Sequence, residues 1–423
     1  MLLHLGVLLI PLAKIEIFAS SYINKARSLL FLLMMLTAVF TGAQNKMKSQ
    51  RRFIYIEILL LAVCWIRAYV GDMLNGLKWD DSLEKMLIYL YPMLMLPLVN
   101  LFCTRGWKFE NCARLIIAAT TADTLLKMFM SFYESVSGTL LWPNIVSGEM
   151  GYRNGLYRIN PAGFSILVIP LAFWLMTKAE KLPERILYLS VIGIDLLYAF
   201  VIWQARSALL YKSILLVMLF FFQRTTDKRR IVRFLILIAA IIIFINTPTF
   251  NNFVDSFSES NAEYGDNTMY RRYALQYFIS LYEEQPFFGV GLLDYLQRRY
   301  RLGGTLEDVG FLYSIVQLGI PMVAFYITMF SRCVYVALAK LRKRPDERLL
   351  LLSITFMYLI FGINIDTFYM YGLTVPFYIA MVEYFNWLAY REDRRLLPRI
   401  GVYAPREKDP AHENTARELP GAV

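Results

Sequence analysis

Histidine is nearly absent from this chain. Only His4 and His412 occur among 423 residues, one near the start and one near the end. A histidine base in the middle of the chain is therefore excluded, and a zinc or haem site is not expected. Cysteine is scarce too, and its four residues fall in apolar stretches or at their ends. We expect no disulfide, no bound metal and no cofactor.

Charge is also sparse. Only 18% of the residues are charged, 57% are hydrophobic, and the mean hydropathy is +0.46. A soluble chain could not cover that much apolar surface, so the sequence predicts an integral membrane protein. The net charge of +11 lies mostly in short loops beside apolar stretches, where membrane orientation and anionic lipid account for it. No nucleic-acid partner is expected.

Apolar runs predict an all-α polytopic fold. A crossing helix needs roughly 20 apolar residues, and about twelve such spans can be drawn. The first segment lacks the basic start and cleavage site of a signal peptide, so it is expected to stay as a span. The predicted spans are 2–18, 27–43, 53–70, 84–103, 112–133, 160–177, 186–203, 208–223, 234–246, 309–339, 349–366 and 371–390.

Lys/Arg-rich loops set the expected orientation. They alternate along the chain, so they fall on one side of the membrane, which the positive-inside rule makes cytoplasmic. Both termini are then cytoplasmic. Residues 1–400 form a single domain in the cytoplasmic (inner) membrane, and the polar tail 401–423 is expected to be disordered. The loops are 45–52, 105–108, 178–185, 224–233 and 340–348.

The largest outer loop is predicted at 247–308, between the ninth and tenth spans. It contains an amphipathic stretch, 269–296, that predicts a surface helix followed by a turn over Pro286–Gly291. Arg271 and Arg272 in this helix lie on the side where arginine is disfavoured. Positioning in the membrane therefore does not explain them.

Three further arginines precede predicted spans on the outer side. Arg153 and Arg158 flank a helix start at Asn160-Pro161, and each could bind substrate or reach to lipid headgroups. Arg206 lies in the turn QARSALL, beside a helix start. A helix N-terminus and a guanidinium both favour an anion such as phosphate, although a simple membrane anchor is the alternative.

Two acids, Glu307 and Asp308, come directly before the tenth span. They could cap its N-terminus, or one of them could act as a general base. Within the membrane, charges are costly unless they face the bundle interior, and Asp195 and Lys212 on consecutive spans could form a pair with a purely structural role.

The order of these features resembles the O-antigen polymerase and O-antigen ligase superfamily. YRNGLYRINPAGFSIL resembles the family's Arg–Gly–Asn–Pro stretch, and QARSALL resembles its Ser-Arg-rich turn. Arg271 and Arg272, followed by Pro286, Gly289 and Gly291, resemble its Arg…Pro-x-x-Gly-x-Gly run, which continues into Gly310 and Leu318-Gly319-Ile320.

The resemblance implies a C-type glycosyltransferase fold and a metal-independent enzyme that uses an undecaprenyl-diphosphate-linked glycan on the periplasmic or extracellular face. Arg206 with Arg271 or Arg272 would hold the donor diphosphate, and Arg153 and Arg158 would lie near the second lipid-linked chain. The resemblance does not identify the base, for which Glu307 and Asp308 are the candidates from their position in the chain. The partners implied are the lipid-linked oligosaccharide and membrane lipid, and a chain-length regulator is a further candidate.

The ligases of this superfamily carry a histidine near the end of the large loop, where this chain has Glu307 and Asp308. This difference favours a polymerase of O-antigen, capsule or exopolysaccharide repeat units over a ligase. A flippase of lipid-linked oligosaccharide is the rival from another class, but many transporters are built of two similar halves, and no half-to-half similarity is visible. A non-catalytic assembly partner is a third alternative.

Overall fold

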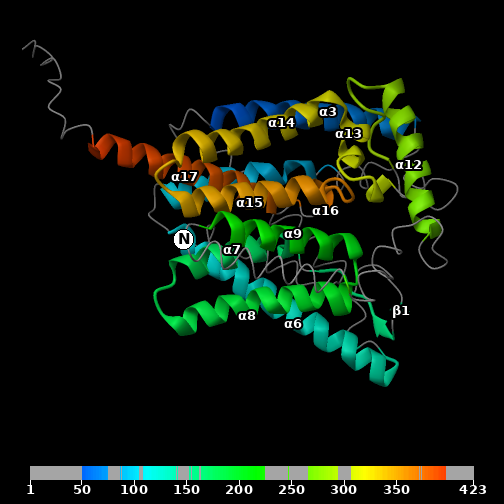
Figure 1. Cartoon of the computed structure of the whole chain (residues 1–423). Helices are drawn as coiled ribbons and strands as arrows, with labels where there is room; N and C mark the ends of the chain where they lie inside the picture. The colour runs from blue at the N-terminus through cyan, green and yellow to red at the C-terminus, as the bar shows by residue number, and fades with distance from the viewer. Residues whose placement is uncertain are drawn as a thin grey trace, which may run out of the picture.

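The computed structural model is a bundle of apolar helices with one helix lying across its end (Figure 1). The structure describes residues 50–74, 86, 88–103, 108–139, 141, 152–153, 155–161, 163–223, 246, 265–293, 306–370, 372 and 374–396. The predicted spans 2–18 and 27–43, the ninth span apart from Asn246, and the tail 401–423 lie outside these residues.

Helices cover the other predicted spans. In the first half they are α3 (Gln50–Leu74), a 3-10 turn η2 (Tyr91–Leu94), α5 (Met95–Cys103), α6 (Phe109–Ser137), α7 (Ser165–Lys178), α8 (Leu182–Tyr198), the π-helical η4 (Ala199–Trp203) and α9 (Arg206–Phe222). In the second half they are α12 (Gly265–Glu284), η5 (Leu306–Asp308), α13 (Leu312–Leu318), α14 (Ile320–Tyr335), the π-helical η6 (Val336–Lys340), α15 (Pro345–Phe361), α16 (Thr367–Met370) and α17 (Thr374–Leu396). A short hairpin joins β1 (Tyr152–Arg153) to β2 (Leu156–Tyr157).

Four helices in the described residues are long and apolar enough to cross a membrane: Arg52–Val70, Phe109–Ser137, Leu182–Trp203 and Ile320–Lys340. Two shorter apolar helices, Ile88–Cys103 and Ser165–Lys178, lie beside them. The predominantly helical, membrane-protein character expected from composition is thus confirmed. The total of twelve spans stays a prediction.

α7 occupies the middle of the bundle. Its sequence SILVIPLAFWLMTK is apolar all round, and every residue from Ser165 to Leu175 is buried. A helix that is hydrophobic on all sides belongs inside a protein rather than at its surface. Pro170 lies within it, which membrane helices tolerate because neighbouring groups can satisfy the freed backbone.

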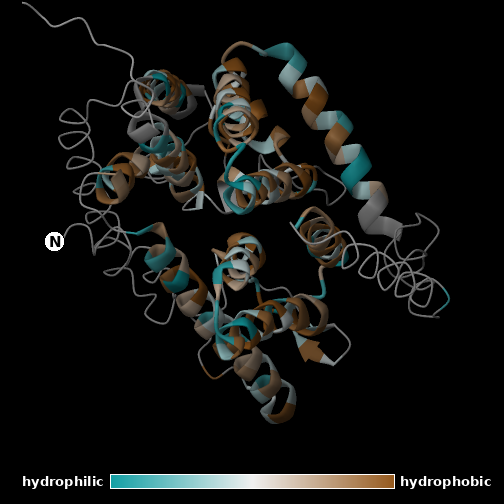
Figure 2. Cartoon of the chain, turned by 60° about the vertical axis from the view of Figure 1, so that its left-hand side comes forward, coloured by the Kyte–Doolittle hydropathy of each residue, from teal (hydrophilic) through white to brown (hydrophobic). Residues whose placement is uncertain are grey.

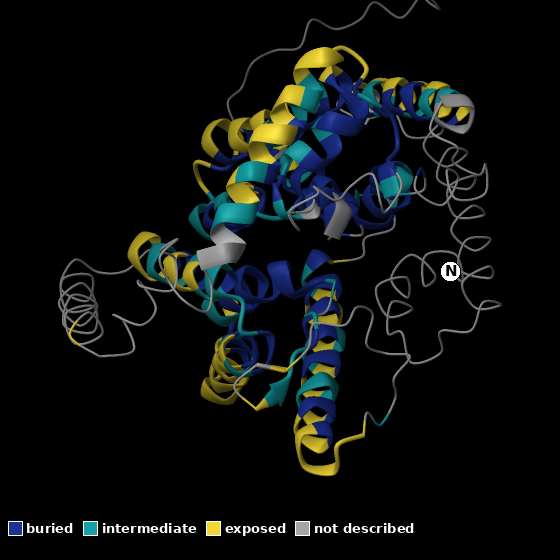
Figure 3. Cartoon of the chain, turned by 90° about the vertical axis from the view of Figure 1, so that its right-hand side faces the viewer, coloured by how far each residue is buried: buried dark blue, intermediate teal, exposed yellow. Residues whose placement is uncertain are grey.

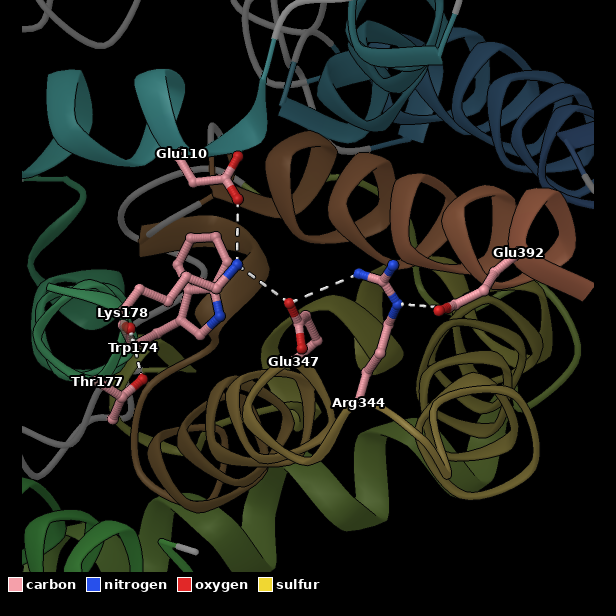
Figure 4. Close-up of polar contacts among 7 residues, drawn as sticks. All are labelled: Glu110, Trp174, Thr177, Lys178, Arg344, Glu347 and Glu392. Carbon is pink, nitrogen blue, oxygen red and sulfur yellow. Dashed lines mark hydrogen bonds and ion pairs between the residues drawn. The ribbon is translucent and has the colours of Figure 1, made fainter. Parts of the chain in front are cut away.

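A charged network joins four helix ends at one end of the bundle (Figure 4). Lys178 at the end of α7 contacts Glu110 at the start of α6 (3.1 Å) and Glu347 at the start of α15 (3.0 Å). Arg344 in turn contacts Glu392 of α17 (3.0 Å). These ends belong to the side predicted to be cytoplasmic, so the alternation of the helices is supported. Which side faces the cytoplasm stays a prediction.

Charged pairs inside the bundle follow the expectation. Lys212 of α9 contacts Asp195 of α8 at 2.7 Å, and both side chains are buried. On α6, Lys127 pairs with Asp123 one turn away at 3.0 Å. Each of these two cations has a counter-charge, as an apolar surrounding requires.

The predicted tenth span, 309–339, is not one continuous helix. It breaks at Gly319, which separates α13 from α14 and has φ 67° and ψ −149°. The turn after α12 fills the break: Val290 N donates to Val316 O (2.8 Å) and Ile320 N donates to Pro286 O (3.1 Å). Backbone groups freed by the break thus find partners in the turn after α12 rather than in the helix.

α12 confirms the helix expected within the outer loop. It lies across one end of the bundle, roughly at right angles to the long helices, with its exposed side turned outward (Figures 1 and 3). Hydrophobic and hydrophilic residues alternate along it (Figure 2). Its inner face carries Ala274 and Phe278, which pack with Leu306, Val309 and Tyr313 in a small core of their own.

Candidate functional site

The β1–β2 hairpin places Arg158 against the turn that precedes α9. Strand β2 is fixed to α6 because Ser131 Oγ donates to Tyr157 O (2.7 Å). The next residue, Arg158, donates from Nε to Trp203 O at 3.0 Å, across 45 residues of sequence. Arg158 is therefore half-buried and bonded to the end of η4, rather than simply reaching toward headgroups. Arg153 lies in β1, and its side chain is outside the described residues.

The chain after Arg158 is held by a buried tyrosine. Tyr198 OH donates to Ile159 O (2.8 Å) and lies 3.2 Å from Asn160 O. The segment that the sequence predicts as a helix start is thus fixed to the end of α8 before α7 begins.

The turn between η4 and α9 is conformationally unusual. Gln204 has φ 50° and ψ 30°, and it is the one non-glycine residue with positive φ in the described part of the chain. Its side-chain amide nitrogen, Nε2, donates to Val201 O at 2.9 Å, and this hydrogen bond stabilises the turn locally. Such conformations cost energy and tend to occur at functional sites. Two residues later Arg206 begins α9, as QARSALL predicts.

Arg271 on α12 contacts Asp308 on η5. Arg271 Nη2 lies 3.3 Å from Asp308 Oδ1, and the two side chains are 48% and 41% exposed. Arg272, the next residue, lies over the ring of Tyr273 at 5.5 Å. Of the two adjacent arginines, the structure thus joins Arg271 to an acid that the sequence singles out.

A hydrogen bond joins α9 to the turn before α16. Asn364 Nδ2 donates to the hydroxyl of Tyr211, five residues after Arg206 on α9, at 2.5 Å. Two segments 153 residues apart in sequence therefore meet there.

The prediction that Glu307 and Asp308 cap the N-terminus of the tenth span is wrong, because both residues lie in a separate turn before that helix begins. Residues 306–308 form the separate turn η5, and α13 begins only at Leu312. Its N-cap residue Phe311 makes no side-chain cap bond. Asp308 instead contacts Arg271, and the side chain of Glu307 lies outside the described residues.

Sequence reasoning missed Asp366. This residue is 1% exposed and accepts bonds from Ser314 N (3.0 Å), Tyr326 OH (3.0 Å) and Phe368 N (2.7 Å). Ser314 Oγ also donates to it. The sequence did offer a signal for it, which is a single acid at the end of an apolar span. Charged residues are rare in membrane segments, and those that occur there usually have a functional or structural role.

Residues 189–327, about a third of the chain, match the family model described as O-Antigen ligase. Over this region the chain is similar to the O-antigen ligase/polymerase superfamily, as its motifs predict. The matched region runs from α8 to α14, so it contains Arg206, Arg271, Arg272, Glu307 and Asp308. No curated protein matches the chain.

Members of the matched family are glycosyltransferase-like enzymes that act on lipid-linked oligosaccharide. Within the described residues, no group of three His, Cys, Asp or Glu side chains is placed to hold a metal ion. Arginines and carboxylates are thus the charged groups that this end of the bundle offers to a substrate.

Proposed function

We propose that this protein is the polymerase of a surface polysaccharide, and that it joins oligosaccharide repeat units carried on undecaprenyl diphosphate. An acceptor sugar hydroxyl attacks the anomeric carbon of the donor glycan. The bond from that carbon to the diphosphate oxygen breaks, and the hydroxyl proton passes to a base. The product is a longer glycan and a free lipid diphosphate.

The observation that carries this proposal is the exposed contact between Arg271 and Asp308. The reaction needs positive charge on the leaving diphosphate and a base for the attacking hydroxyl. Arg271 offers the first and Asp308 the second, and they lie 3.3 Å apart at the end of the bundle crossed by α12. Both belong to the region that matches the family.

An exposed ion pair of this kind contributes little stability, about 0–1 kcal/mol. A diphosphate, with its higher charge, can therefore displace Asp308 from Arg271. Binding of the donor would then free the carboxylate to accept a proton at the moment when the leaving group is neutralised. Arg206, at the first residue of α9, supplies a second guanidinium beside a helix N-terminus for the same diphosphate.

Polymerase is preferred to ligase because the chain has no histidine between His4 and His412. Transfer of finished glycan to a lipid acceptor is the second candidate within the same family. Glu307 and Arg272 remain candidate contributors beside Asp308 and Arg271, and Arg153 and Arg158 are candidates for the side of the second lipid-linked chain. A chain-length regulator is proposed as a partner only.

A flippase is the rival that one structural observation favours, because α13 and α14 form a discontinuous helix, as in many transporters. Here, however, the break lies where an outer-loop turn docks, and that turn satisfies its backbone groups. The break therefore has a sufficient structural cause without transport.

The size distribution of lipid-linked glycan tests the proposal. Cells lacking the gene, and cells with Arg206→Ala, are expected to accumulate single repeat units on the outer face. Arg342→Ala, an exposed arginine near the end of η6, serves as the matched control and should support normal polymer. Long polymer left on its carrier would indicate a ligase. Repeat units trapped on the cytoplasmic face would indicate a flippase.

A further inference from the structure

Asp366 is buried in a way that needs explanation. It lies in the turn between α15 and α16, is 1% exposed, and accepts hydrogen bonds from Ser314, Tyr326 and Phe368. Its carboxylate is surrounded by backbone and hydroxyl donors. Burial of a carboxylate is tolerated only when its oxygens are hydrogen-bonded. The hydrogen bonds of Asp366 therefore fix the segments that donate them.

One of its oxygens satisfies the start of α13. Ser314 N is the third backbone donor of that helix, and the first turn of a helix leaves such donors without partners inside the helix. Side-chain oxygens near the helix start normally accept these bonds, but α13 has no cap of its own. Asp366 Oδ2 accepts from both Ser314 N and Ser314 Oγ, so the cap comes from a different part of the chain.

The same turn holds the residue before α13. Phe311 N donates to Gly362 O at 2.8 Å. A side chain at Gly310, which has φ +64°, would collide with the backbone of Gly362 and Ile363. The turn 362–366 and the segment 310–314 therefore pack backbone against backbone, two residues after Asp308.

The other end of α13 supports α12. Val316 O and Gln317 O accept from Val290 N (2.8 Å) and Gly291 N (3.1 Å), which belong to the turn that follows α12. Phe278 of α12 packs in the same small core as Tyr313 and Val316 of α13. One short helix thus supports Arg271 through α12 and Asp308 through η5.

We infer that Asp366 is a positioning residue for the Arg271–Asp308 pair, acting through α13. This inference rests on the proposed function, in which that pair contacts the diphosphate and the acceptor. Loss of the carboxylate charge weakens the cap, lets α13 shift, and moves both partners relative to each other. Small misplacements of this kind lower turnover more than substrate binding.

Two readouts on the full-length protein in nanodiscs test the inference. The first is elongation of the lipid-linked repeat unit extracted from cells that lack the gene. The second, which needs no activity, is cross-linking by dibromobimane between Arg271→Cys and Asp308→Cys, in a background where the four native cysteines are alanine. Glu383→Gln is the matched control, because Glu383 is equally buried but is paired with Arg332 on another helix pair.

Asp366→Asn is expected to lower kcat roughly ten- to hundredfold, with KM changed by less than about threefold. The same substitution should lower the cross-linking yield several-fold, whereas Glu383→Gln should leave both readouts near the parent values. Wild-type turnover in Asp366→Asn, or lost turnover with unchanged cross-linking, would overturn the inference.

Less disruptive variants keep the test decisive if Asp366→Asn does not fold. Ser314→Ala removes one donor from the α13 side, and Tyr326→Phe removes the donor from α14. Ser314→Ala should reduce cross-linking more than Tyr326→Phe, and the reverse order would contradict the inference. If the parent protein itself elongates nothing, the proposed function fails, and the cross-linking result still decides whether Asp366 positions the pair.

Discussion

Lys212 on α9 reaches Asp195 on α8 at 2.7 Å, and the two side chains are 1% and 5% exposed. Lys212 lies six residues after Arg206 on α9, so the pair joins the helix that begins with Arg206 to the helix before it. The Lys212 ammonium also lies 6.0 Å from the ring of Trp203, whose carbonyl is bound by Arg158.

Removal of one partner of this pair should be far more harmful than removal of both. Asp195→Asn or Lys212→Met leaves a buried group without its counterpart, which typically costs about 3–5 kcal/mol. The double variant Asp195→Leu with Lys212→Met should recover most of that stability. Glu392→Gln, at the partly exposed contact with Arg344, is the control and should cost no more than about 1 kcal/mol. Thermal unfolding in detergent measures all four, and equal losses in the single and double variants would contradict the expectation.

The two adjacent arginines of α12 should differ in importance. Arg271→Gln removes the guanidinium that contacts Asp308 and should lower polymer elongation on the order of a hundredfold. Arg272→Gln, which loses a guanidinium placed over Tyr273, should lower it by less than about tenfold. Rates are measured at equal protein amounts with extracted lipid-linked repeat unit. A larger loss for Arg272→Gln than for Arg271→Gln would contradict the assignment of the diphosphate contact to Arg271.

Gly319 should not tolerate a side chain. It has φ +67°, and a Cβ there would lie 2.6 Å from both Gly289 N and Phe287 O. Gly319→Ala should therefore destabilise the protein by about 1–3 kcal/mol and release the turn after α12. Gly193→Ala is the control: Gly193 lies in α8 with open space around it and should gain up to about 1 kcal/mol. Unfolding temperatures compare the two, and equal stability would show that the turn does not dock at the break.

Orientation can be measured by labelling. Ile363 is 67% exposed in the turn after α15, and Lys181 is exposed at the opposite end of the bundle. In a variant whose four native cysteines are alanine, Ile363→Cys should react with a membrane-impermeant maleimide in intact spheroplasts. Lys181→Cys should react only after lysis, because its loop is predicted to be cytoplasmic. The opposite pattern would invert the topology and move the candidate site to the cytoplasm.

Most of the helices and one buried pair could be predicted from the sequence. Apolar length specifies helices such as α3, α6 and α8, and two opposite charges on consecutive spans must meet in an apolar bundle. The helix α12 followed from its amphipathic pattern together with the Pro286–Gly291 turn. These features depend on residues that are near each other in the chain.

The break at Gly319 and the role of Asp366 could not be predicted in this way. Around Gly319 the sequence is mostly apolar, and the break depends on the turn beginning at Pro286, more than thirty residues earlier. The cap on α13 comes from Asp366, 52 residues after Ser314. Contacts between distant segments decide both, and neither leaves a local periodic pattern.

The cap supplied by Asp366 also has a consequence for biosynthesis. Arg271 and Asp308 leave the ribosome well before Asp366 does, and the turn that fixes α13 is made only when α15 is complete. The described segments that carry Arg271 and Asp308 therefore cannot reach their final positions around α13 until the turn 362–366 has been made. A truncated chain would carry both charged partners without the support that aligns them, so assembly of the site is delayed until the protein is nearly finished.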